Sequence, residues 1–351
     1  MAIGQYANLG GLSYVAVGRE TTSGTYNTCT ASIDCLSASL VTQLDNKIIE
    51  QIEGSRTYSK RIALMKKVSG SLDFYYSPTE LAHNYILQNA IGGSVTSATA
   101  TGETAGAAGN SAITHTFSIG NMAESFSSLC INVRKGDGTN GQVFQYSGMK
   151  VNQIGFSANV DDALKVSAGF VGLDSTQNTN DVASILTASA YELLTFVDGR
   201  VSVETTFASL TSSSFWHVQS VEFGWSNNLK ADADGGRIGS QVLTLLQAGM
   251  MNFNLKCKMR YDTTTAYDAM INATQLSVQL HFQGSTLAGS VIRRSVQFNF
   301  PKLHVNNSGD PTIGGPDQIL TSDIDFHVLQ DDSSSGGYAM RMLITNQTAA
   351  F

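Results

Sequence analysis

Residues 68–93, VSGSLDFYYSPTELAHNYILQNAIGG, contain the unit that decides the fold, a strand followed directly by a helix. Alternation of apolar and polar residues over 68–76 predicts a half-buried strand. Residues 78–91 predict a helix, with Ser77 placed as its cap and Gly92 ending the run. The apolar stripe at helical spacing consists of Leu81, Tyr85, Ile86 and Leu87.

A second helix with the same features is predicted at residues 262–274, with Asp262 as its cap and Tyr267, Met270 and Ile271 on its stripe. Asn89-Ala90 then aligns with Asn272-Ala273, an offset of 272 − 89 = 183, and nearly the same spacing relates Leu44-Asp45-Asn46 to Ser226-Asn227-Asn228. Both halves show the order strand, long loop, strand, helix and further strands. This indicates an internal duplication of one α+β domain, with domains at 1–190 and 191–351.

Period-2 alternation recurs along most of the chain, so the fold class is mainly β. Residues 92–112 (GGSVTSATATGETAGAAGNSA) lack such a period and are rich in Gly and small residues, which favours a flexible surface loop inserted in the first domain. The other predicted strands are 128–134, 142–147, 164–171, 200–207, 218–225, 250–259, 276–283, 294–300 and 323–329.

Composition and charge narrow the class of protein. The 351 residues are 42% hydrophobic and 14% charged, so the chain has enough apolar residues for about two folded domains. No apolar stretch is long enough to span a membrane, and we expect no secretory leader. With 21 Lys and Arg against 28 Asp and Glu, the net charge of −7 argues against a protein that grips nucleic acid.

The sequence contains partial matches to cofactor-binding and metal-binding motifs, but their surroundings do not fit those functions. Residues 136–141 (GDGTNG) match a dinucleotide fingerprint, but strands flank them, which favours a β-hairpin turn. Residues 232–235 (DADG) resemble a calcium loop, yet Lys230 and Gln241 stand where oxygen ligands are required. The four cysteines form no CxxC pair, and no nucleophile stands in a catalytic motif. We therefore predict no catalytic residue, no cofactor, no metal and no enzyme activity.

One basic run stands out in RTYSKRIALMKK, residues 56–67. Nucleic-acid binding, a solvated strand face and complementarity to an acidic surface are the three interpretations. The third would match this run against acids in the corresponding loop of the second half, between stacked copies of the chain. The candidate interface residues are Arg56, Lys60, Arg61, Lys66, Lys67, Asp232 and Asp234.

Several short segments together resemble the tail tube (major tail) proteins of long-tailed bacteriophages. Glu20 followed by Gly24-Thr25 is similar to the family's N-terminal pattern, and the strand 68–74 running into a helix that ends at 90–92 is similar to its next element. The remaining segments are Thr116-Phe117-Ser118-Ile119, Tyr146-Ser147-Gly148-Met149-Lys150-Val151-Asn152 and Phe223-Gly224-Trp225-Ser226-Asn227-Asn228-Leu229. The insertion 92–112 departs from the pattern.

This resemblance implies a structural virion protein made of two tandem β-sandwich domains, each with one flanking helix. Inner sheets of neighbouring domains would close a ring around a lumen, and stacked rings would form a tube for genome ejection. Two domains per chain imply trimeric, pseudo-hexameric rings, with hexameric rings as the alternative. Luminal residues are expected to be acidic and small polar, and the arm 1–30 and the loops 45–66 and 227–247 are expected to make contacts between subunits.

The implied partners are copies of the chain itself, the tape measure protein and DNA transiently in the lumen, and the tail terminator and distal tail proteins. The implied location is the virion tail, assembled in the host cytoplasm, with no membrane association. The rival hypothesis is a virion decoration or receptor-binding β-sandwich protein, which would expose aromatic or charged groups in loops at one end.

Overall fold

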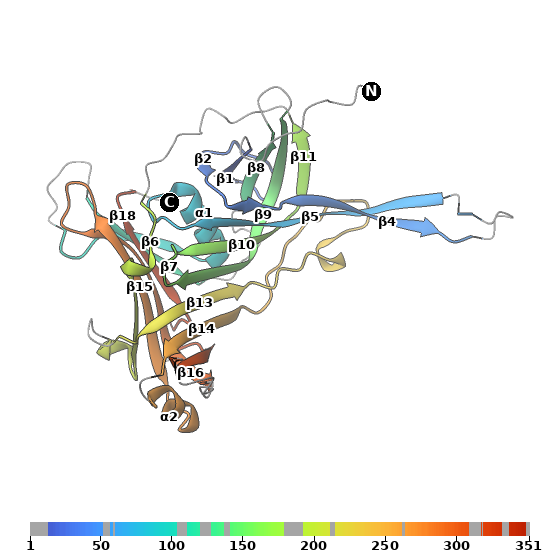
Figure 1. The fold of residues 1–351 in the computed structure, drawn as a ribbon. Helices are drawn as coiled ribbons and strands as arrows, with labels where there is room; N and C mark the ends of the chain where they lie inside the picture. Colours follow the sequence, from blue (N-terminus) through green and yellow to red (C-terminus); the bar gives the residue numbers. More distant parts are fainter. Residues whose placement is uncertain are drawn as a thin grey trace.

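The structure is a computed structural model that describes residues 13–51, 57–58, 60–103, 111–119, 128–136, 141–178, 192–210, 215–261, 264–308, 317, 319–331 and 337–348. Strands dominate these residues, which confirms the mainly β class (Figure 1). The elements are β1 (Tyr14–Arg19), β2 (Ala31–Ile33), β3 (Ser37–Ala38), β4 (Val41–Ile49), β5 (Lys60–Tyr75), α1 (Leu81–Ile91), β6 (Val95–Thr99), β7 (Ile113–Ser118), β8 (Leu129–Lys135), β9 (Gln142–Asn159), β10 (Lys165–Gly172), β11 (Asp174–Asn178), η3 (Phe196–Asp198), β12 (Gly199–Glu204), η4 (Phe207–Ser209), β13 (Val218–Ser226), η5 (Ala233–Gly235), β14 (Asn252–Arg260), α2 (Thr265–Ile271), β15 (Leu276–Thr286), β16 (Arg293–Asn307), β17 (Thr321–Val328) and β18 (Arg341–Asn346).

Alternation decides which face of each strand is buried. In β10, Val166, Ala168 and Phe170 are buried, whereas Lys165 and Ser167 lie on the opposite face. Because successive side chains of a strand point to opposite faces, one face packs into the core and the other stays polar. The same pattern holds in β14 and β17.

One antiparallel sheet runs through both halves of the chain. Its strands pair in the order β4, β5, β10, β9, β13, β14, β17 and the end of β16. The pairing of β9 with β13, from Ser226↔Gln153 to Ser220↔Asn159, joins the two halves. Figure 1 shows β13 and β14 continuing the sheet of β5, β10 and β9. We call this the joined sheet.

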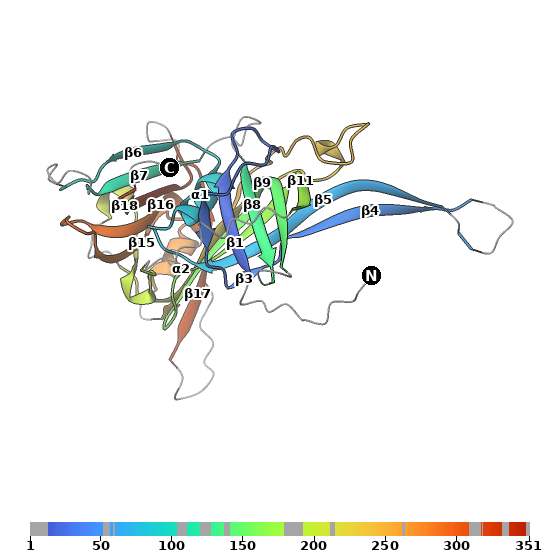
Figure 2. The ribbon, with the colours of Figure 1, turned by 90° about the horizontal axis from the view of Figure 1, so that it is seen from above.

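The long strands β9 and β16 each belong to two groups of strands. The first part of β9 pairs with β8 and β11, while its last part pairs with β10 and β13. The first part of β16 pairs with β15 and β18, and its end pairs with β17. The remaining strands extend these groups, β2 and β1 beside β8, β12 beside β15, and β7 and β6 beside β18 (Figure 2).

Six strands of the first half pair with one another in the same way as six strands of the second half. β1, β8, β9, β10, β5 and β11 correspond to β12, β15, β16, β17, β14 and β18. The irregularities recur as well: the register shifts between Leu129 and Ile131 in β8 and between Leu276 and Val278 in β15. A β-bulge is a specific local feature of a strand pair, so bulges at corresponding places support the correspondence between these strands of the two halves.

A second pair of bulges places an asparagine at corresponding points of the two long strands. The pairing of β9 with β10 passes from Gln153 to Val151, which leaves Asn152 as the extra residue. The pairing of β16 with β17 passes from Asn307 to Val305, which leaves Asn306 as the extra residue.

The core is continuous across the junction of β9 and β13. The Phe156 ring of β9 stacks on the Phe223 ring of β13 with centroids 4.6 Å apart and an interplanar angle of 2°. The Phe298 ring of β16 meets Phe223 edge-on at 4.5 Å. Such aromatic contacts have specific geometry and add to the free energy of area burial.

The helices begin differently from the prediction. α1 has Glu80 at its cap position with no side-chain cap bond, and Ser77 lies in the turn before it, where its amide donates to His83 Nδ1. Gly92 ends α1 as predicted, in the left-handed conformation at φ 67°. The stripe predicted for the second helix is wrong at two of its three residues: Met270 packs against the core, but Tyr267 and Ile271 are exposed. Ala266 and Ala269 are the buried residues of α2. The small face lets this short helix lie close to the sheet. Asp262 lies outside the described residues.

Two segments expected as loops contain strands. The expected loop 45–66 is largely two paired strands that project from the molecule (Figures 1 and 2). From here on, the arm means β4 and the part of β5 that pairs with it, residues 60–69. Part of the insertion 92–112 forms β6, because its Ser and Thr residues extend alongside β7. The predicted boundary at 190 lies outside the described residues.

Candidate functional site

The exposed face of the joined sheet is polar. One row of residues facing one another across it runs Tyr75, Lys165, Ser157, Glu222, Lys256 and Asp325. Directly opposed side chains on one face lie close enough to interact, and opposite charges there are stabilising. The charges in this row alternate in sign, and Lys256 Nζ lies 3.4 Å from Asp325 Oδ1.

The polar face is hollowed at its centre. A groove of about 620 Å³ is lined by side chains of β5, β9, β10, β13 and β14, among them Asp73, Gln153, Ser167 and Asn254. Partial burial tends to raise the pKa of Asp73, but hydrogen bonds from Ser167 and Ser37 and the charge of Lys165 outweigh it and hold that pKa below its ordinary value. The groove therefore presents an ionised carboxylate among small polar groups.

The junction of β9 and β13 is fastened at one end by two asparagines. The Asn152 main-chain oxygen accepts from the Asn227 amide at 2.7 Å, and its Oδ1 accepts from the Leu229 amide at 2.7 Å. The buried Asn227 side chain donates to the Val151 oxygen and to the Ala90 oxygen at the end of α1, both at 2.9 Å. These bonds satisfy buried main-chain groups and fix the register of the junction. The family resemblance included Asn152 and Asn227 in its motifs, but spacing gave no sign that the two meet.

The predicted interface residues differ in how far they are exposed and in where they lie. Lys66 pairs with Asp174, and Lys67 lies 2.7 Å from Asp45, so these two cations have partners within the chain. Lys60 and Arg61 are exposed on the arm. Arg56 lies outside the described residues.

Asp232 and Asp234 lie around η5, in a segment packed against the base of the arm. The Lys66 amide donates to the Gln241 oxygen at 2.7 Å, and Lys66 forms a bridge with Val242. The structure thus brings the base of the arm beside the segment that carries the two acids, whereas Lys60 and Arg61 lie further out.

Glu20 connects two segments that the family resemblance singled out. Its buried carboxylate accepts from the Gly24 amide and the Gly148 amide, both at 2.9 Å, and from Ser128 Oγ. Burial raises the pKa of Glu20 despite these bonds. The carboxylate has partners inside the fold, which makes it a structural group.

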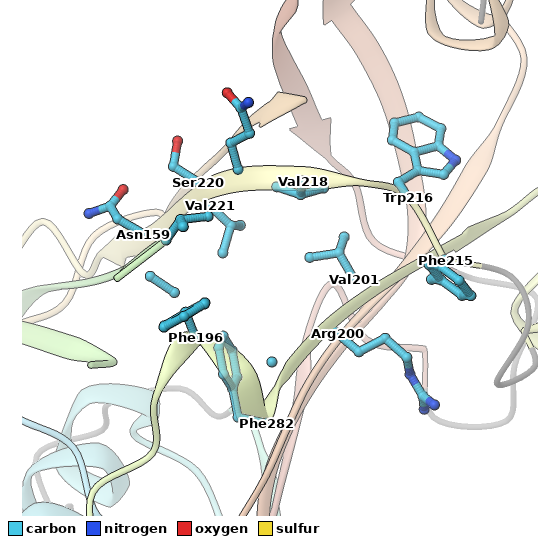
Figure 3. Close-up of a pocket in the computed structure, with 14 residues that line it drawn as sticks. Asn159, Phe196, Arg200, Val201, Phe215, Trp216, Val218, Ser220, Val221 and Phe282 are labelled. Atoms are coloured by element: carbon cyan, nitrogen blue, oxygen red, sulfur yellow. The ribbon is translucent and has the colours of Figure 1, made fainter. Parts of the chain in front are cut away.

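A cavity of about 150 Å³ lies where the end of β9, β12 and β13 meet (Figure 3). Its walls are mainly apolar, with Phe196, Phe215 and Phe282 around it, and Arg200 is its charged residue. Burial and the Arg200 charge lower the pKa of the neighbouring His281 to about 4. A general base works best when its pKa is near the working pH, so His281 is poorly suited to that role at neutral pH.

Among the described residues, no group of three or more His, Cys, Asp or Glu side chains is placed to hold a metal ion. Of the two helices in the part of the chain that the structure describes, neither is long and apolar enough to cross a membrane.

Comparison with known proteins identifies a family. The family model described as phage tail tube protein matches residues 10–328. No curated protein matches the chain. A solved structure described as "Crystal structure of Hcp protein" is similar at 11% identity over 44% of this chain and 94% of that chain, with a TM-score of 0.25, a similarity too low to support an argument.

The family match extends from the segment before β1 to the end of β17, and so includes both helices, both long strands and the junction between the halves. It confirms the resemblance found in the sequence. This chain belongs to the phage tail tube protein family, and it is a structural protein of the virion tail.

Proposed function

We propose that copies of this chain close into rings, and that the rings stack into the tube through which the genome leaves the virion. The single observation that carries this proposal is the junction of β9 and β13, where one half of the chain adds its strands to the sheet of the other. A sheet that grows in this way exposes strand edges until it closes, and closure removes them.

Two tandem β-sandwich domains, 1–190 and 191–351, are the proposed building blocks. The repeated strand pairing and the repeated bulges support this division. If a ring holds six such domains, three chains close it, and we propose this trimeric, pseudo-hexameric ring over a ring of six chains.

The polar face of the joined sheet is the proposed lumen wall. Small polar residues are abundant there, in line with the sequence-based expectation, but its charges differ from it. Asp73, Glu222, Asp323 and Asp325 share the face with Lys165, Lys256, Lys258 and Arg260. A wall with mixed charges neither binds a polyanion strongly nor repels it strongly, which suits a conduit for DNA.

The arm of β4 and β5 is the proposed contact between successive rings. Its exposed apolar residues include Ile48 at 54% and Ile62 at 50%, and its exposed cations include Lys60 and Arg61. Apolar side chains exposed on both strands of a projecting hairpin fit a surface that is covered on assembly. We keep Arg56, Lys66, Lys67, Asp232 and Asp234 as proposed contributors to the same contact.

The other proposed partners are the tape measure protein and DNA in the lumen, and the tail terminator and distal tail proteins at the tube ends. Assembly in the host cytoplasm, and a purely structural role without enzyme activity, cofactor or metal, belong to the same proposal. The family match supports the tail location and the structural role.

Electron microscopy of the purified full chain tests this function. The expected result is rings or tubes with a central hole, and native mass spectrometry of single rings is expected to give three chains. Discrete particles without a hole would instead support a virion decoration or receptor-binding protein.

A further inference from the structure

In the junction inside the chain, the end of β9 joins the two halves by pairing with β13, and the second half contains a counterpart of β9. β16 takes in the second half the place of β9 in the first, with Asn306 as the bulge residue where β9 has Asn152. β9 goes on to pair with β13. In the described part of the chain, no strand stands in the place of β13 beside the end of β16.

The missing neighbour exists at the other end of the chain. β13 pairs with β14 as β3 and β4 pair with β5, each pair preceding a helix. On the opposite side, β13 has β9, whereas among the described strands β3 and β4 have only β5. Leu36 and Val41 are 51% and 44% exposed along this stretch. An exposed strand edge with apolar side chains is a template for another strand.

The repeated bulges fix which residues correspond. Phe170 and Phe326 each face the residue just before the bulge, Val151 in β9 and Val305 in β16. Their partners in the next strands are Gly70 and Leu255. Counting three residues back along those strands gives Lys67, which pairs with Gln43, and Asn252, which pairs with Ser226. Gln43 of β4 therefore corresponds to Ser226 of β13.

We propose that the end of β16 of one copy pairs with the β3–β4 edge of a second copy in the register of the internal junction, with Asn307 opposite Gln43. Asn306 then holds the second copy's main chain at Leu44 and Asn46, as Asn152 holds the amides of Asn227 and Leu229. The donors are main-chain amides, so neither Leu44 nor Asn46 needs a particular side chain. This inference rests on the proposed function and names the surfaces through which copies join.

Disulfide trapping tests the register in the full-length chain. Gln43→Cys with Asn307→Cys, in a Cys35→Ser background, is expected to give covalent oligomers when assembled protein is oxidised, since directly opposed residues have Cβ atoms about 5 Å apart. The mass of the covalently closed oligomer also gives the number of chains in a ring. Equimolar mixing of the two single variants is expected to give dimers only. The matched control, Val41→Cys with Asn307→Cys, is slipped by two residues and is expected to remain uncrosslinked.

Asn306→Ala tests the fastening group. The Asn306 side chain is exposed in the single chain, so the unfolding temperature of unassembled protein is expected to stay unchanged. The concentration needed for half-assembly is expected to rise about tenfold, the loss of one hydrogen bond that fixes a strand. Asn307→Ala, next to it, is expected to shift that concentration less than about twofold on the same reasoning.

The outcomes separate this inference from the function on which it rests. Rings or tubes that form without the Gln43–Asn307 cross-link, or that cross-link the control pair instead, would overturn the register and leave the tube function standing. Wild-type protein that forms neither rings nor tubes would overturn both.

Discussion

The Glu20 carboxylate accepts a hydrogen bond from the Gly148 amide at 2.9 Å, across 128 residues of chain. Gly148 has φ 65°, and a Cβ there would lie 2.5 Å from Leu173 Cγ. A left-handed glycine thus turns its amide toward a buried acid, and the bond ties the segment after β1 to the middle of β9. Two motifs that are far apart in sequence are one structural latch.

Loss of this latch is expected to destabilise the fold. Glu20→Ala leaves the amides of Gly24 and Gly148 without their acceptor in a buried place, at a cost of about 2–4 kcal/mol. Chemical denaturation of unassembled protein measures it. Glu50→Ala, at an exposed position, is the matched control and is expected to change the free energy of unfolding by less than about 0.5 kcal/mol. Equal effects of the two substitutions would contradict the latch.

The raised pKa of Glu20 also predicts a pH effect of definite sign. Between the ordinary value of 4.5 and the higher pKa of the folded state, the folded chain binds more protons than the unfolded chain. The stabilisation that comes from the proton on Glu20 is therefore fully present below pH 4.5 and is lost as pH rises through the folded pKa. Glu20→Gln is expected to remove this dependence, which denaturation at a series of pH values measures. An unchanged pH profile would contradict it.

For His83, the change of stability with pH is expected to have the opposite sign to that for Glu20. Its ring is fully buried, stacked on Phe74 with centroids 4.5 Å apart, and burial lowers its pKa from 6.5 to about 4. The unfolded chain then binds more protons between these values, so stability falls as pH drops from 6.5 to about 4, by about 3 kcal/mol. His83→Phe is expected to flatten this part of the profile. Denaturation at a series of pH values measures this effect, and an unchanged profile for the variant would contradict it.

Two glycines at the junction of β9 and β13 are expected to differ in how well they tolerate substitution by alanine. Gly224 and Gly155 face each other across it. A Cβ at Gly224 would lie 2.2 Å from the Ile154 oxygen, whereas a Cβ at Gly155 meets nothing within 4 Å. Gly224→Ala is expected to lower the free energy of unfolding by more than about 2 kcal/mol, while Gly155→Ala changes it by less than about 1 kcal/mol. Thermal unfolding compares them, and similar melting temperatures would contradict the close approach.

The arm predicts a separation of folding from assembly. Deletion of residues 50–62 is expected to leave folded protein that does not form tubes, because the arm contributes exposed surface and not core. Lys60→Glu with Arg61→Glu is expected to slow tube growth with little change in melting temperature. Arg293→Glu, at an exposed cation of β16 outside the arm, is the control and is expected to leave tube growth unchanged. Normal tubes from the deletion variant, seen by electron microscopy, would contradict the role of the arm.

The proposed lumen predicts an electrostatic effect on DNA passage. Asp73→Lys with Glu222→Lys turns a mixed wall into a cationic one, and repeated rings multiply the change along the tube. Phage with these substitutions are expected to eject DNA more slowly, with the delay shrinking as salt is raised. Asp162→Lys, at an exposed position outside both the groove and the arm, is the control. Unchanged ejection kinetics in tails of normal length would contradict the luminal placement.

Alternation predicted the strands that have one buried and one polar face. All ten predicted strands are present, including those of β8, β10, β14 and β17. The edge strand β6 and the arm were missed, because their mostly exposed side chains lack a one-sided core to impose the period. The α2 stripe was wrong at Tyr267 and Ile271, because the face of this helix that meets the core carries Ala266, Ala269 and Met270.

The sequence by itself determined the mainly β class and the tail tube family, because these follow from local periodicity and short motifs; it also predicted a duplicated strand–helix unit. Only the tertiary structure decided the pairing of β9 with β13, the meeting of Glu20 with Gly148, and the correspondence of Asn152 with Asn306. Each depends on register between strands far apart in the chain, and register is set by packing and bulges that a linear pattern does not record.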